Sequence, residues 1–345
     1  MFCLILHRMG FTEPDVSPRP LVVSYSTLSP LPLARGGLLS VALACGLLRV
    51  GVTHHPALWC PDFPRPQSRS SAAPSRSSYF SQDWLERVIR ATKLAVMMIL
   101  LPPSEGKTAP QTGSPLDFNE LLFPELSGER RTLIQELQVV SSLAGAHEIL
   151  RVGKTLTDEI TANQHILDAP TAPAWQVYTG VLYDALDYGT LEGIDENVTL
   201  AFSALFGVTR LSDRIPTYRF PAAAKLPGIG NTGTWWRERL TDQMADFATG
   251  PIIDCRSSSY KPFWKTPPLR TVTIDVFQRV NGELKVVSHW AKQARGFVAR
   301  HLLQAQAKQP LGSIDQVADS VSEIYEVEMV PPTTRKPASL RIVLN

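Results

Sequence analysis

The chain has 345 residues, of which 44% are hydrophobic and 19% charged, and its formal net charge at pH 7 is +2. Residues 1–96 carry nine Arg and one Lys against five acidic residues, whereas the remainder carries 24 basic and 27 acidic residues, a balance of −3. A uniformly cationic body is therefore excluded, and any nucleic-acid partner must meet a local basic patch. The length is sufficient for the core of one large domain or two smaller ones.

Cysteine, histidine and hydropathy patterns exclude further classes of protein. Only one of the four cysteines, Cys255, lies after residue 96, which predicts a reducing, cytoplasmic location without disulfides. The seven His form no paired ligand motif, so we expect no directly bound metal and no cofactor. The most apolar run, 36–52, is interrupted by Arg49 and is shorter than the roughly 20 residues of a membrane helix, so we expect no membrane partner.

Residues 1–96 differ in composition from the rest of the chain. The run "RPQSRSSAAPSRSSYF" consists largely of Arg, Ser and Pro and offers little to bury. Met97 and Met98 then precede a strand-like run. Two interpretations follow: a start codon assigned too early, so that the protein begins near Met97, or a disordered basic arm that binds anions. We favour the first, and place the folded domain at residues 97–345.

From Met97 onward the pattern indicates alternating strands and helices. "MMILLPP" predicts a buried strand, "RTLIQELQVVSSLAGAHEIL" and "TWWRERLTDQMADFATG" predict helices, and "PIIDC" predicts a short buried strand. "RTVTIDVFQRVNGELKVVSHW" predicts a hairpin turning at Asn281-Gly282, followed by a long helix and two terminal strands. We therefore expect an α+β fold, a mixed α/β single domain with central strands covered by helices.

Two glycine-containing turns are candidates for phosphate binding. Residues 205–213 place Gly207 between two short helix-like pieces, and Arg210, Arg214 and Arg219 follow. Amides at the start of the second piece would then point outward, and the three arginines could flank a phosphate. Residues 226–230, Leu-Pro-Gly-Ile-Gly before a helix, resemble the hairpin of helix-hairpin-helix DNA-binding modules, and the Gly207 turn is a competing or additional site. The alternative for the first turn is an ordinary corner with solvated arginines.

Two polar loops follow predicted strands. In "LLPPSEGKT" Lys107 can meet a phosphate, and Glu105 can orient it or act as a base, although the first glycine of a Walker A loop is absent. In "CRSSSYKPFWK" Tyr260 can stack on a base, and Cys255 is expected to be a small buried residue. If the two loops converge, Lys107 and Glu105 are catalytic candidates of an enzyme acting on a nucleotide or damaged base. Otherwise the first loop only caps a core strand.

One helix carries a further basic pair. Lys292 and Arg295 lie three residues apart in "HWAKQARGFVARHLL" and so occupy adjacent positions on the helix surface. Such a pair is ordinarily solvated, but it can also contribute to a basic surface patch.

The order of several segments is typical of one protein family. "ILLPPSEGKT", "VYTGVLYDAL", "FSALFGVTRLSDRIPTYRF", "IIDCRSSSY" and "VVSHWAKQARGFVARHLL" together resemble the peroxide stress protein YaaA family over about residues 97–345. The resemblance implies a cytoplasmic protein that protects bacterial cells during hydrogen peroxide stress, in association with lower free intracellular iron. Because no metal motif is present, we expect any effect on iron to be indirect.

The resemblance also implies a fold and a partner. The fold it implies is a mixed α/β architecture with a helix-hairpin-helix element. The partner it implies is double-stranded DNA, whose phosphate backbone would bind in a positively charged cleft. The hairpin element most resembles residues 205–213, which include Gly207, although Arg210-Leu211-Ser212-Asp213 lacks a proline at its second position. The expected cleft residues are Lys107, Arg210, Arg219, Lys292 and Arg295, with Tyr260 alongside. No reaction follows from the resemblance, so a DNA-binding protein without catalysis is the expectation and the enzyme is the alternative.

Overall fold

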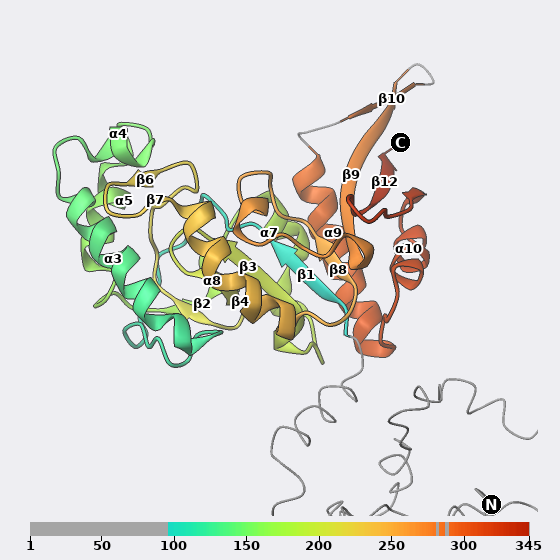
Figure 1. Cartoon of the computed structure of the whole chain (residues 1–345), viewed down its shortest axis with the longest axis horizontal. Helices are drawn as coiled ribbons and strands as arrows, with labels where there is room; N and C mark the ends of the chain where they lie inside the picture. The colour runs from blue at the N-terminus through green and yellow to red at the C-terminus, as the bar shows by residue number, and fades with distance from the viewer. Residues whose placement is uncertain (1–95, 281–282, 287–289, 345) are drawn as a thin grey trace, which may run out of the picture. The chain divides into compact units, whose positions relative to one another are not determined.

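A mixed β-sheet forms the centre of the fold (Figure 1). The structure is a computed structural model and describes residues 96–280, 283–286 and 290–344. The two interpretations of the N-terminal segment concern residues outside these ranges. The predicted Asn281-Gly282 turn also lies outside them. Within the described residues the main sheet has eight strands, ordered β11-β12-β9-β8-β1-β3-β4, with β10 paired to β9. Their bounds are β1 Met98–Leu101, β3 Thr199–Ser203, β4 Gly207–Arg210, β8 Ile252–Asp254, β9 Thr271–Val280, β10 Glu283–Val286, β11 Glu326–Val330 and β12 Ala338–Leu344.

The strands from β12 to β3 are parallel, and β11, β10 and β4 pair antiparallel at the margins. Every residue of β1, β3 and β8 is buried. Central parallel strands are covered on both faces, which is why these segments read as continuous apolar runs. The predicted strand at Met97–Leu101, the β9–β10 pairing and the two terminal strands are confirmed.

Helices cover the sheet, and further helices lie beyond one end of it (Figure 1). α8 lies in front of β3 and β4 in Figure 1, and α7 packs against α9. The helices are α3 Ser127–Ser141, α4 Ala146–Leu150, α5 Thr157–Ala162, α6 Ala174–Val177, α7 Val181–Leu186, α8 Thr232–Phe247, α9 Ala291–Lys308 and α10 Ile314–Ser322. Short 3₁₀ helices are η5 Pro124–Leu126, η6 Asn163–His165, η7 Tyr188–Thr190, η8 Glu196–Val198, η9 Lys261–Phe263 and η10 Pro268–Arg270. The α+β class, with central strands covered by helices, is confirmed.

Minor hairpins complete the fold. β2 (Ala172–Pro173) pairs with β5 (Arg214–Ile215), and β6 (Lys225–Leu226) pairs with β7 (Gly230–Asn231). α8 begins directly after β7, where the Asn231 side chain accepts a hydrogen bond from the Thr234 amide at 3.0 Å. The turn at 226–230 therefore lies between two short strands and leads into a capped helix.

The predicted helix-hairpin-helix at residues 205–213 is wrong. Gly207 begins β4 in a β-hairpin with β3, and it is buried. The run "TLAFSALF" suits a helix in isolation, but its first five residues form β3, which pairs with β1 in the core. Tertiary packing therefore overrides local propensity. Buried amides on this hairpin do not reach a phosphate.

Gly207→Ala is expected to destabilise the protein by about 2–4 kcal/mol, which combines left-handed backbone strain with overpacking. Gly207 has φ +73°, and an added Cβ would lie 2.6 Å from Cε3 of Trp236. Trp236 cannot easily retreat because its Nε1 donates a hydrogen bond to the Ala204 carbonyl at 2.8 Å. Urea unfolding measures the loss. Gly230→Ala is the matched control, since Gly230 has φ +77° but no heavy atom within 4 Å of the added Cβ. Equal losses in the two variants would contradict the assigned role of Trp236.

Candidate functional site at the carboxyl edge of the sheet

The loops after β1, β3 and β8 lie at one edge of the sheet because these three strands are parallel. From β1 the chain continues to its neighbour β3, whereas from β8 it continues to β9 on the other side. The strand order therefore reverses between β1 and β8. In open α/β sheets ligands bind outside the carboxyl ends of the strands at such a reversal.

Lys107 lies in the loop after β1, fixed by the segment between α6 and α7. Lys107 forms an isolated bridge with Tyr178, and the Thr108 amide donates to the Val177 carbonyl at 2.9 Å. The Lys107 Nζ donates to the Ser104 carbonyl at 2.7 Å and lies 4.4 Å from the ring centroid of Tyr218. The ammonium is thus enclosed by its own loop and by aromatic rings.

This enclosure changes the protonation of the amine. Burial lowers the pKa of Lys107 to about 8, with Glu105 opposing the shift and Arg219 adding to it. Roughly a tenth of the amine is then neutral at pH 7, against roughly three in ten thousand for an ordinary lysine. No ion pair to Lys107 is present within the described residues.

A pair of tyrosine hydroxyls lies beside Lys107. The hydroxyls of Tyr178 and Tyr218 are 2.9 Å apart, and the Tyr183 hydroxyl donates to the Pro102 carbonyl at 2.8 Å. Burial raises the pKa of Tyr178 to about 12 and that of Tyr218 well above its usual value, although Ser203 at the end of β3 lowers both. The tyrosines therefore stay protonated and offer Lys107 neutral partners.

Arg219 joins the loop after β1 to α5. Its guanidinium donates to the Glu105 carbonyl at 2.8 Å and lies 3.4 Å from the Glu105 carboxylate and 3.5 Å from that of Glu159. Its Nε is buried and has no hydrogen-bond partner in the described part of the chain. We call Glu105, Lys107, Tyr178, Tyr218 and Arg219 the Lys107 cluster.

The loop after β8 reaches the same place. The two loops begin side by side, because the Cys255 amide donates to the Leu100 carbonyl at 2.9 Å. The Tyr260 pKa is raised, first by burial and next by the charge of Glu105. Tyr260 is only 5% exposed, and its ring centroid is 5.2 Å from that of Phe263. This ring belongs to the core and is not presented for base stacking.

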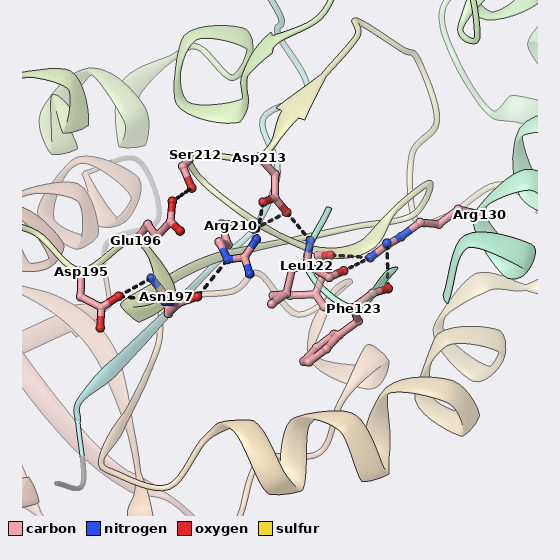
Figure 2. A network of polar contacts seen from close by, with 10 residues as sticks. Leu122, Phe123, Arg130, Asp195, Glu196, Asn197, Arg210, Ser212 and Asp213 are labelled. Carbon is pink, nitrogen blue, oxygen red and sulfur yellow. Dashed lines mark hydrogen bonds and ion pairs between the residues drawn. The ribbon is translucent and has the colours of Figure 1, made fainter. Parts of the chain in front are cut away.

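The remaining predicted residues do not join one groove. Arg210 pairs across from Leu200, near the amino end of β3, where it bonds Asp213 at 3.0 Å and Asn197 at 2.9 Å (Figure 2). Arg295 donates to the Ile274 carbonyl at 3.1 and 3.2 Å. Lys292, in the first turn of α9, is exposed. The predicted arginines are therefore used within the protein, and Lys107 lies with Arg219 and Tyr260 but not with Arg210.

Sequence reasoning missed several residues at this edge. Asp254 and Arg256 form a buried ion pair at the end of β8, with Nε to Oδ1 at 2.9 Å. The Arg256 guanidinium also donates to the Trp264 carbonyl at 3.0 Å and so holds the loop that contains Tyr260. The available signal was an acid and an arginine two residues apart directly after a buried strand. The enclosing tyrosines, Tyr178 and Tyr218, had no comparable signal.

The described residues also bear on a metal site, a reactive thiol and a membrane-spanning helix. They contain no group of three or more His, Cys, Asp or Glu side chains placed to hold a metal ion. Cys255 is buried, and burial raises its thiol pKa to about 12, in agreement with its expected role as a small core residue. Among the helices of the described ranges, none combines the length and apolar character needed to cross a bilayer.

Comparison with known proteins identifies the family. A UPF0246 protein of Streptomyces coelicolor is 37% identical over 262 residues, covering 72% of this chain and 99% of that protein. A UPF0246 protein of Corynebacterium efficiens is 41% identical over 227 residues, covering 65% of this chain and 91% of that protein. An uncharacterized protein of Campylobacter jejuni is 32% identical over 224 residues, covering 61% and 87%. Residues 97–329 match the family model described as peroxide stress protein YaaA, and the chain belongs to this family.

Proposed function

We propose that this protein acts in the cytoplasmic response to hydrogen peroxide by binding the phosphate backbone of double-stranded DNA at the carboxyl edge of its sheet. The family description supports the peroxide role. DNA binding is supported by three lysines at this edge, Lys261, Lys265 and Lys292, whose side chains are exposed and have no hydrogen bond or ion pair to other described residues. Any lowering of free iron would then be an indirect effect of this binding.

The positions of these lysines carry the proposal. Lys261 and Lys265 lie in the loop after β8, which Arg256 holds in place. Lys292 lies one turn before Arg295 on α9. The Arg295 guanidinium donates to the carbonyl of Ile274 on β9. Ile274 directly follows Thr273, which pairs with Asp254 at the end of β8. Exposed lysines can neutralise phosphates, whereas the bonded arginines would first have to break internal contacts.

Salt-dependent affinity for a DNA duplex tests the proposal. Three phosphate contacts predict that log K falls with log salt concentration with a slope of about −3. The triple variant Lys261→Glu/Lys265→Glu/Lys292→Glu is expected to lose binding at every salt concentration, as measured by fluorescence anisotropy.

The control variant makes the same change in net charge as the test variant, but at the opposite edge of the sheet. Lys308 ends α9, and Arg335 and Lys336 precede β12, so all three lie toward the amino ends of the parallel strands. Their triple replacement by Glu is expected to leave most of the affinity. Loss of binding in both triple variants, or salt-independent binding, would contradict a phosphate site at the carboxyl edge.

A second candidate function is an enzyme acting on a nucleotide or damaged base. The observation that favours it is the Lys107 cluster, which places a desolvated amine at the reversal of strand order. Under this candidate the exposed lysines hold the nucleic acid, and Lys107 and Glu105 act on it.

A further inference from the structure

We propose that Lys107 is a nucleophile that forms a covalent imine with an aldehyde, the group carried by the ring-opened sugar of an abasic site in DNA. This inference rests on the second candidate function. It concerns the chemistry of one amine, so it stands apart from phosphate binding by the exposed lysines.

The placement of the amine is the first argument. Among the described residues the Lys107 Nζ has one hydrogen-bond acceptor, the Ser104 carbonyl at 2.7 Å, and it otherwise faces the rings of Tyr218 and Tyr178 at 4.4 and 5.7 Å. A lysine that serves only to form a surface ion pair would contact a carboxylate. Here both nearby carboxylates, Glu105 and Glu159, are bound by Arg219.

The surroundings of the amine also favour its neutral form. Burial is the main cause of the lowered pKa, and the charge of Arg219 adds to it. A lysine is activated as a nucleophile by desolvation or by a neighbouring cation, and Lys107 has both. The residue is half-buried, and the adjoining Glu105, Gly106 and Thr108 are exposed, so the loop faces solvent.

The proposed step is balanced. The neutral Lys107 amine attacks the aldehyde carbon, the carbonyl π electrons pass to oxygen, and a proton moves from nitrogen to that oxygen to give a carbinolamine. Loss of water then forms the C=N bond. We assign these proton transfers to the exposed Glu105 carboxylate, which belongs to the same loop and whose charge acts on Lys107. The step needs no oxidant, reductant or metal.

Reductive trapping tests the proposal on the full-length chain. The protein is incubated with sodium cyanoborohydride and either propanal or an abasic DNA duplex, and the modified residue is identified by peptide mass mapping. At pH 7 we expect propanal to modify Lys107 at least tenfold faster than exposed Lys225, because a much larger fraction of its amine is neutral. Raising the pH from 7 to 9 should shrink this preference, since the Lys107 fraction saturates near its pKa of about 8.

Variants separate this inference from DNA binding. Lys107→Arg keeps the positive charge of the side chain. Lys107→Met keeps the approximate length of the side chain and is the second variant, to be used if the arginine perturbs the fold. Both variants should lose the adduct while binding of the intact duplex persists. Lys225→Arg is the control and should leave the Lys107 adduct unchanged. Trapping by the abasic duplex assigns DNA as the source of the aldehyde, and trapping by propanal alone assigns a free aldehyde. No preferential adduct at Lys107 with either reagent would overturn the proposal, even if the duplex binds.

Discussion

Arg130→Met is expected to lower the free energy of unfolding by about 3–5 kcal/mol, because it removes a buried guanidinium that donates to four backbone carbonyls. Arg130 is 0% exposed. Its guanidinium donates to the carbonyls of Phe206 at 3.1 Å, Phe123 at 3.1 Å, Leu122 at 2.5 Å and Val208 at 3.2 Å. Figure 2 shows the bonds to Leu122 and Phe123.

These bonds join two distant parts of the chain. The segment at Leu122–Phe123 precedes η5, whereas Phe206 and Val208 belong to the β3–β4 hairpin. Phe123 has φ 56°, a left-handed conformation that is unfavourable for a non-glycine residue. Arg130 holds its carbonyl in place. Burial lowers the pKa of Arg130 to about 10, while the charge of Asp213 opposes the shift, so the guanidinium stays charged at neutral pH.

Denaturant unfolding of Arg130→Met measures this loss. The matched control is Arg131→Met, because Arg131 is exposed and its only described contact is with the Phe118 ring, at 4.2 Å from the centroid. A cation–π contact at an exposed site contributes about 0.5–1 kcal/mol. If the two variants lost similar stability, the buried hydrogen bonds would not be the main contribution of Arg130.

Asp254→Ala is expected to cost about 3–5 kcal/mol, because it leaves the Arg256 guanidinium buried without its counter-ion. The pair is bidentate, with Nε–Oδ1 and Nη2–Oδ2 distances of 2.9 Å. Asp254 and Arg256 are 5% and 2% exposed. The guanidinium also lies 4.5 Å from the ring centroid of Phe202 on β3.

A double-mutant cycle gives the coupling within this pair. Asp254→Ala/Arg256→Met should be less destabilised than the sum of the single variants, because it removes both buried charges together. Additive losses would show that the pair is not coupled. Arg256 also contacts the Tyr260 and Trp264 carbonyls, so Asp254→Ala should weaken DNA binding by loosening the loop with Lys261 and Lys265.

The local sequence pattern predicted the strands and helices whose burial follows a regular period along the chain. Buried runs gave β1 and β8, alternation gave the β9–β10 pairing, and helical spacing gave α8 and α9. "TLAFSALF" failed as a helix because its strand state depends on pairing with β1, which lies about a hundred residues earlier in the chain. The Lys107 loop was recognised from its composition, whereas its tyrosine neighbours were not.

By itself the sequence determined the family, the α+β class and the residue types available for anion binding. Each of these follows from local spacing, composition and the order of segments. Only the tertiary structure decided which charges are free, because the partners of an arginine come from distant loops. Arg219 is bound by Glu105 and Glu159, and Arg210 by Asp213 and Asn197, so both are internal connectors. Burial among distant aromatic rings is likewise what separates Lys107 from an ordinary surface lysine, since desolvation depends on what packs around a group.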